Sequence, residues 1–216
     1  MRWPIGFIWV CCAINPAAAE SFRDSDDYLD LPDCAAARQW RAGGAETRPF
    51  DATRLLGAAY ACAAAGDASE AMALQALADA LPRSDHLFGT DGDSTRVRIA
   101  LALGELDRAS ALLRVSSQTV LDQWSTIADP MSVMHAAHAM QTLNDRIATE
   151  LRQRGDPVGA VAHLLLAARA YDLPDLGMPE SAALSRNVAL ETALAAGRGD
   201  LLIIASDAML ALPVGT

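Results

Sequence analysis

The chain has 216 residues and a formal net charge of −10, with 52% hydrophobic and 20% charged residues. Every one of its 17 basic residues is arginine. Such an acidic chain is a poor partner for nucleic acids and for anionic membranes, because both attract positively charged proteins. A chain of this length can bury one sizeable core.

The first nineteen residues have the pattern of a bacterial-type secretory signal peptide. Arg2 gives a positive start, residues 5–14 form an apolar run, and residues 17–19 are three small alanines. We predict cleavage after Ala19 and a periplasmic or secreted mature protein. Loss of Arg2 then takes the charge from −10 to −11 (−10 − 1). The alternative is an uncleaved anchor, although the run is short for a membrane span.

Beyond residue 19 the sequence has no second apolar stretch of about 20 residues, so we expect a mature chain that does not span a membrane. Residues 20–32 are acidic and polar and predict a flexible lead-in to a folded domain at 33–216. Two cysteines remain, Cys34 and Cys62. In an oxidising compartment they predict one disulfide, with two buried free thiols as the alternative.

Apolar residues at three- and four-residue steps predict a pair of helices within residues 53–82. Gly66 can end the first helix in the left-handed conformation, and Asp67 can cap the second. Ala71 is small enough to let the two helices approach closely. The pattern G-[DE]-x-x-x-A begins at Gly66 and recurs at Gly104 and Gly155, with a fainter copy at Gly199-Asp200. We therefore predict the same turn at each of these glycines.

The remaining elements follow from caps, breakers and helical periodicity. In chain order they are a helix at 33–42 capped by Asp33, a surface loop at 83–95, a short helix pair at 96–115, a connecting helix at 117–128, a helix from Pro130 to Arg154, a helix from Pro157 capped by Asp156, a loop at 172–180, and a last pair at 182–197 and 200–212. No segment has a convincing strand period. The predicted fold class is all-α, an array of helical hairpins.

These hairpins resemble tetratricopeptide repeats. That family places a small residue after a G-D turn, another seven residues later, and a proline at the end of the second helix. The residues that follow this order are Gly66-Asp67, Ala71, Ala78 and Pro82. The predicted turns are 38, 51 and 44 residues apart (104 − 66, 155 − 104, 199 − 155), against about 34 in the family. A related helical-hairpin repeat is the alternative. The resemblance implies an α-solenoid whose concave surface is lined by first helices.

The resemblance also implies a scaffold that binds a protein or peptide, or assists assembly. Counting back from each turn glycine in the family's manner, the groove-facing candidates are Arg98, Thr149, Arg152 and Arg186. Arginines gathered on an acidic protein would suit an acidic peptide or a chain-terminal carboxylate through bidentate bonds. The alternative is that they are ordinary solvated arginines.

Sequence motifs for catalysis or cofactor binding are missing. The chain has no phosphate loop, dinucleotide fingerprint or G-x-S-x-G elbow, so we predict no catalytic residue, no cofactor and no metal. His135 and His138 share a helix face, but no further metal-ligand motif accompanies them. Two alternatives stay open: a small all-helical envelope enzyme that uses these histidines and the 83–95 loop, and an accessory subunit that docks on a membrane complex through its apolar C-terminal helix.

Overall fold

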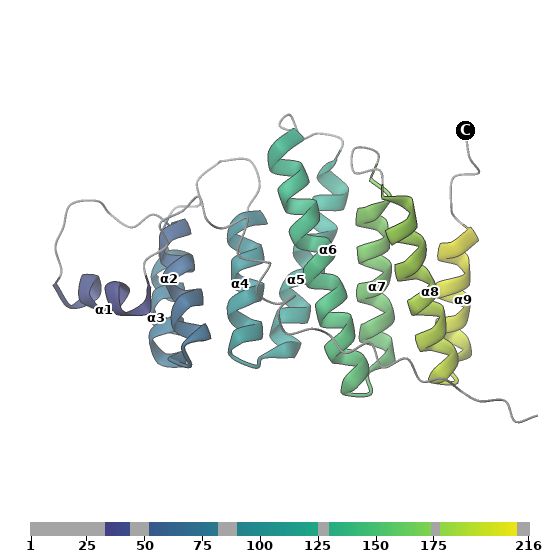
Figure 1. Cartoon of the computed structure of the whole chain (residues 1–216), viewed down its shortest axis with the longest axis horizontal. Helices are drawn as coiled ribbons and strands as arrows, with labels where there is room; N and C mark the ends of the chain where they lie inside the picture. The colour runs from purple at the N-terminus through teal and green to yellow at the C-terminus, as the bar shows by residue number, and fades with distance from the viewer. Residues whose placement is uncertain (1–32, 44–51, 82–89, 125–129, 174–177, 211–216) are drawn as a thin grey trace, which may run out of the picture. The chain divides into compact units, whose positions relative to one another are not determined.

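A computed structural model of the chain describes residues 33–43, 52–81, 90–124, 130–173 and 178–210 (Figure 1). The predicted signal peptide and the lead-in at 20–32 lie outside these ranges. Every regular element within them is a helix, and all belong to one compact unit, Pro32–Thr216. The predicted all-α class is therefore confirmed for the described residues.

The described ranges hold nine helices. They are α1 (Cys34–Gly43), α2 (Ala52–Ala64), α3 (Ala68–Ala80), α4 (Thr90–Ala102), α5 (Leu106–Gln123), α6 (Pro130–Gln153), α7 (Pro157–Tyr171), α8 (Pro179–Ala195) and α9 (Gly199–Leu210). None of these helices is both long enough and apolar enough to cross a membrane.

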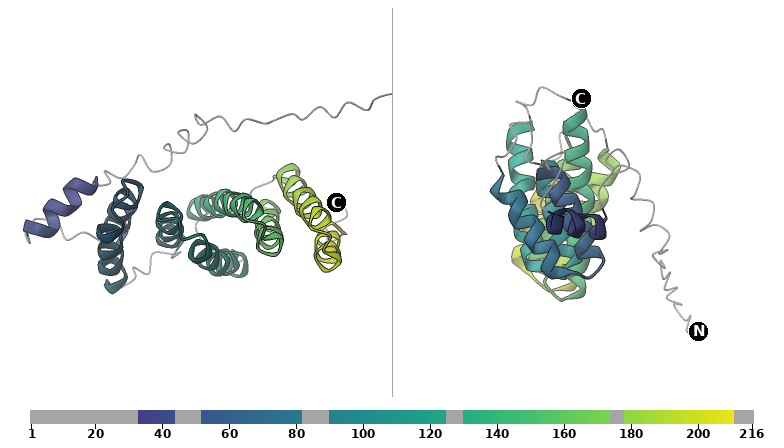
Figure 2. Two further views of the ribbon diagram at one scale, coloured as in Figure 1. Left: turned by 90° about the horizontal axis from the view of Figure 1, so that it is seen from below. Right: turned by 90° about the vertical axis from the view of Figure 1, so that its left-hand side faces the viewer.

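From α2 onward the helices pack as four successive pairs, α2 with α3, α4 with α5, α6 with α7, and α8 with α9 (Figures 1 and 2). Neighbouring pairs are also in contact. Helix α4 touches α2 and α6, while α7 touches α5, α8 and α9. Helix α1 packs on α2. We call α3, α5, α7 and α9 the second helices of their pairs.

The turns inside the four pairs share one set of backbone hydrogen bonds. In the first turn, the Gly66 N–H donates to the Ala63 carbonyl (3.0 Å) and the Asp67 N–H donates to the Cys62 carbonyl (2.9 Å). This is the Schellman arrangement, which needs a left-handed residue at the glycine; Gly66 has a φ of 82°. The turns at Gly104 and Gly155 repeat both bonds, so the three predicted turns are confirmed.

The fourth turn lies two residues earlier than predicted. Gly197 has the positive φ (64°), while Gly199 is the first residue of α9. The prediction at Gly199 was wrong because it required an acidic residue after the glycine. The backbone requires only the glycine, and the Arg198 N–H makes the expected bond to the Ala193 carbonyl (3.2 Å). The Arg198 side chain then pairs with Asp200 (2.6 Å).

Two other element boundaries differ from the prediction. The loop predicted at 83–95 is helical from Thr90, and Arg96 holds this helix by pairing with Asp93 (3.2 Å) and with Asp79 of α3 (2.6 Å). The connecting helix predicted at 117–128 is the second half of α5, which runs unbroken to Gln123. Residues 106–123 contain neither glycine nor proline, so nothing in them stops the helix.

The predicted caps are present. The Asp67 carboxylate accepts the Glu70 N–H (3.1 Å), the Asp156 carboxylate accepts the Gly159 N–H (3.0 Å), and Asp33 acts in the same way on α1. Each carboxylate satisfies an amide that the first helical turn leaves without a partner. Local sequence chemistry therefore fixes the start of α1, α3 and α7.

The predicted disulfide between Cys34 and Cys62 is confirmed, and it joins α1 to α2. Two ion pairs also connect α1 to the start of α3: Arg38 with Asp67, and Arg41 with Glu70 (3.3 Å). The core behind them is rich in alanine. Fully buried alanines occur in all four pairs, at Ala58, Ala59, Ala71, Ala100, Ala109, Ala160, Ala189 and Ala205. Such small side chains allow the helices to pack closely.

Candidate functional site

A groove of about 1060 Å³ runs along three second helices, α5, α7 and α9. Helix α7 lies between α5 and α9 and contacts both of them (Figure 1). It therefore forms the floor of the groove, and α5 and α9 form the walls. We call this feature the second-helix groove.

Each helix contributes one stripe of side chains at helical spacing. The α5 stripe is Ala111, Arg114, Val115, Gln118, Thr119 and Asp122. The α7 stripe is Ala162, Leu165, Leu166 and Arg169, and α9 adds Ile204 and Ala208. Apolar side chains are left facing solvent here, since Val115 is 69% exposed and Ile204 is 51% exposed. The groove is thus largely apolar, with polar groups at each turn of α5.

Three arginines and two aspartates line the groove, and they are not equally paired. Arg186 is buried and donates to Asp172, while its Nη1 atom has no hydrogen-bond partner within the described residues. Burial lowers the pKa of Arg186. Asp122 accepts a hydrogen bond from the Gln118 amide (2.7 Å). These contacts leave two exposed arginines on the groove, Arg114 and Arg169.

Arg114 and Arg169 make few contacts of their own. Arg169 donates one long hydrogen bond to the Gln118 carbonyl oxygen (3.4 Å). Arg114 makes no hydrogen bond or ion pair with any other described residue. With three arginines and two aspartates, the groove lining has a formal charge of +1 (3 − 2) on a chain whose net charge is −10.

The structure separates the residues that were predicted to bind a peptide. Thr149 and Arg152 line a second groove, of about 750 Å³, between the C-terminal ends of α6 and α8. Arg186 lines the second-helix groove, and Arg98 is half-buried on α4 and lines neither. The four residues do not form one strip, although Thr149 and Arg152 do lie together.

Sequence reasoning missed Arg114 and Arg169. The signal for Arg114 is the period of polar residues along α5, which becomes visible only when residues 106–123 are read as one helix. Splitting that segment into two helices conceals the stripe. Arg169, on α7, has no such signal. The resemblance to tetratricopeptide repeats also directed attention to first helices, whereas the second-helix groove lies on the other member of each pair.

Behind the groove, a chain of polar side chains crosses α5, α6 and α7. His163 Nε2 lies 2.7 Å from Ser110 Oγ, and His163 Nδ1 lies 2.6 Å from Asn144 Oδ1. Asn144 Nδ2 donates to Ser117 Oγ (2.9 Å) and to the Met140 carbonyl (2.8 Å). His163, Asn144 and Ser117 are fully buried. We call these four side chains the polar network.

One backbone carbonyl sets the direction of every bond in the polar network. The Met140 carbonyl can only accept, so the Asn144 nitrogen donates and its oxygen accepts. His163 must then carry its proton on Nδ1, and its Nε2 accepts the Ser110 hydroxyl proton. Desolvation, with a further contribution from Arg114, lowers the pKa of His163 to about 4. The imidazole is therefore neutral at pH 7.

This Ser–His–Asn order resembles a nucleophile–base–orienter set. A general base works best with a pKa near the working pH, and the His163 pKa lies well below it. The imidazole has no exposed surface, and neither His163 nor Ser110 lines the second-helix groove. The arrangement is suited to fixing the register of α5, α6 and α7, because each of its bonds joins two of these helices or one turn of α6.

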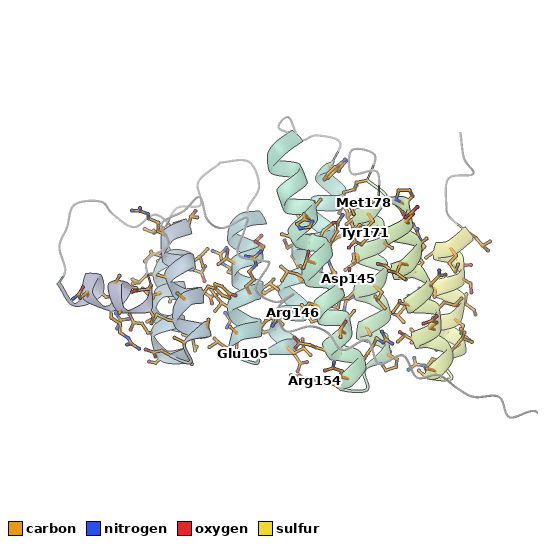
Figure 3. All side chains as sticks on the ribbon, in the orientation of Figure 1. Glu105, Asp145, Arg146, Arg154, Tyr171 and Met178 are labelled. Carbon is orange, nitrogen blue, oxygen red and sulfur yellow. A yellow bond between two sulfur atoms is a disulfide. The ribbon has the colours of Figure 1, made fainter. Side chains whose placement is uncertain are left out.

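A second polar contact lies between α6 and α7, where the Tyr171 hydroxyl donates to Asp145 Oδ2 (3.1 Å); Figure 3 labels both residues. Burial raises the pKa of Asp145. Burial, together with the nearby Asp145 charge, raises the pKa of Tyr171 to about 12. The contact supports the packing of α6 on α7.

His138 is exposed on α6, and the side chain of His135 lies outside the described residues. Among the side chains that the structure describes, no three His, Cys, Asp or Glu residues gather closely enough to hold a metal ion. The 83–95 segment was the other candidate for an enzyme site. Its residues 90–95 belong to α4, and residues 83–89 lie outside the described ranges.

Comparison with protein-family models, curated proteins and solved structures found no match. The fold and the site therefore define the class only as an all-helical protein of paired helices with an open groove on its second helices.

Proposed function

We propose that this protein is a binding or assembly module that holds a segment of a partner protein in the second-helix groove. The observation that carries the proposal is the alignment of three stripes of exposed and half-buried side chains, one from each of α5, α7 and α9. Exposed apolar side chains that gather in one concavity are typical of interaction sites. A groove built from three helix pairs offers a longer contact than a single pair could.

The repeated Schellman turn and the contacts between neighbouring pairs support a tetratricopeptide-like array of hairpins as the architecture. With the fourth turn at Gly197, the turn spacings are 38, 51 and 42 residues (the last 197 − 155). These values also suit a related helical-hairpin repeat. Either architecture would present a rigid scaffold for a partner.

Export to the periplasm or the medium is part of the proposal. The Cys34–Cys62 disulfide supports it, because disulfides persist mainly in oxidising compartments. The apolar run and alanine motif of residues 1–19 support it from the sequence side.

The direct test is site-specific photocrosslinking in cells that naturally make the protein. A photoreactive phenylalanine analogue replaces Thr119 in the groove or, as the control, Arg146, which is exposed on α6 and lies outside the groove lining (Figure 3). We expect a discrete adduct from position 119 only, and Ala162→Trp on the groove floor should abolish it. Equal adducts from both positions, or an adduct that persists with Ala162→Trp, would refute the groove as the binding site.

A further inference from the structure

We infer that the occupant of the second-helix groove is an amphipathic α-helix that carries acidic side chains on its flank, and that Arg114 and Arg169 bind those carboxylates. The inference rests on the proposed binding role of this groove. It adds the shape of the occupant and the chemistry by which the groove selects it.

The walls of the groove favour a helix over an extended strand. An extended peptide gains affinity by pairing its backbone with free N–H and C=O groups, as at a sheet edge. The groove is lined almost entirely by side chains of α5, α7 and α9, with Arg186 from α8, and interior backbone groups are already bonded within each helix. A helical occupant satisfies its own backbone and needs only side-chain contacts.

The length of the groove and the types of residue that line it also fit a helix. Ala111, Ala162 and Ala208, one on each helix, leave room for the close approach of another helix. The α5 stripe from Ala111 to Asp122 is roughly 16 Å long, eleven steps of about 1.5 Å, which matches three turns of a partner helix. Arg114 and Arg169 interrupt the apolar surface, so a purely apolar acyl chain would cover charged groups without supplying a partner for them.

The charges give the second half of the inference. Arg186 is already neutralised by Asp172, while Asp122, whose partner Gln118 is neutral, offsets one of the two remaining arginine charges. Arg114 and Arg169 therefore supply the local positive charge of the groove. An acidic flank would complement them, while a basic flank would be repelled. Because both arginines are exposed, we expect them to select among partners more than they contribute to total affinity.

The test uses a display library of amphipathic helices of about 15 residues, roughly the shortest length that is helical in water. Flank positions vary among Glu, Gln and Lys, and the apolar face varies among Leu, Ile and Ala. Selection on the wild-type protein should enrich Glu on the flank. Selection on Arg114→Glu/Arg169→Glu should enrich Lys instead. An enriched acidic helix should bind this double variant about tenfold more weakly than wild type, because two attractions become repulsions.

The matched control is Arg146→Glu/Arg154→Glu, which changes the net charge equally on exposed α6 and turn residues outside the groove lining (Figure 3). It should leave both the selection and the affinity unchanged. Helices that bind wild type, are lost with Ala162→Trp, but show no flank preference would overturn the acidic-helix inference and leave the groove proposal intact. If no helix is enriched, or if the enriched helices still bind Ala162→Trp, the helical occupant is wrong. Crosslinking from position 119 then decides separately whether the groove proposal stands.

Discussion

Two regions of the described core hold their helices together by different chemistry. Around α1, α2 and α3 the buried side chains are apolar apart from Gln75, and the fixed contacts are a disulfide and ion pairs at the surface. Across α5, α6 and α7 the fixed contacts are buried hydrogen bonds through His163 and Asn144. The first arrangement depends on redox conditions, and the second depends on pH.

The difference follows from the size of the helices that must be aligned. Helix α1 is short, at 10 residues, and packs mainly on α2, so its apolar contact is small and a covalent bond holds it in place. Helices α5 and α6 have 18 and 24 residues, and most of their buried side chains are Leu, Ile, Val or Met, whose contacts have no preferred direction. Directional hydrogen bonds in a dry interior specify one register for them.

Removal of the disulfide should have the largest effect on the free energy of unfolding. Replacing Cys34 and Cys62 together by alanine should lower the free energy of unfolding by about 3–4 kcal/mol, because the unfolded chain loses a cross-link over a loop of nearly thirty residues. Urea denaturation followed by circular dichroism measures the change. Wild-type protein in dithiothreitol is the control and should show a similar loss. A change below about 1 kcal/mol would mean that α1 contributes little to the cooperative unit.

The pH dependence should come next in size. His163 has a pKa of about 4 in the folded protein against an ordinary value of 6.5. Between these values the unfolded state binds a proton that the folded state does not. The stabilisation is therefore complete above about pH 6.5 and is lost as the pH falls toward 4, a change of about 3 kcal/mol.

Comparing variants isolates this contribution. Asp145 acts with the opposite sign, since its raised pKa makes the folded state gain stability as the pH falls. The measurement is the difference in unfolding free energy between pH 7 and pH 4.5 for wild type and for His163→Leu. The difference should shrink in His163→Leu and stay the same in His138→Gln, which removes an exposed histidine from α6. Equal slopes in all three proteins would contradict the buried neutral imidazole.

The smallest expected effect tests the repeated turn, which both regions share. Gly197→Ala should cost about 1 kcal/mol, because alanine is strained in the left-handed region. Gly199→Ala should be neutral or slightly stabilising, because this residue lies at the start of α9 with open space around it. Thermal melting of the two variants provides the comparison. If Gly199→Ala lowers the melting temperature as much as Gly197→Ala, or more, the assignment of the turn to Gly197 is wrong.

Much of the fold could be predicted from local chemistry. Glycine followed by an acid marked three turns, aspartate marked the caps, and two cysteines in a chain predicted to be exported marked the disulfide. These predictions succeeded because each depends on a few neighbouring residues. The fourth turn was misplaced at Gly199 because the pattern required an acidic residue that the backbone does not need. Residues 117–128 were separated from the preceding helix although no glycine or proline divides α5.

The candidate site could not be predicted in the same way, because it depends on which helices lie side by side. Ser110, Asn144 and His163 are far apart in sequence and carry no common motif. Arg114 and Arg169 come together on one surface only because α5 and α7 are in contact. Arg186 was predicted from the sequence as a groove-facing residue. Its burial against Asp172, however, follows from the packing of α8 on α7.

The second-helix groove takes its lining from three consecutive helix pairs, and segments of a folded protein generally open locally with different free energies. A bound partner that contacts α5, α7 and α9 together is released when any one of these helices unfolds. Its binding free energy therefore opposes local unfolding of all three helices. Amide exchange should then slow as one block across residues 106–210 when the groove is filled. Exchange in α2 and α3, which lie outside the lining, should keep its unliganded rate.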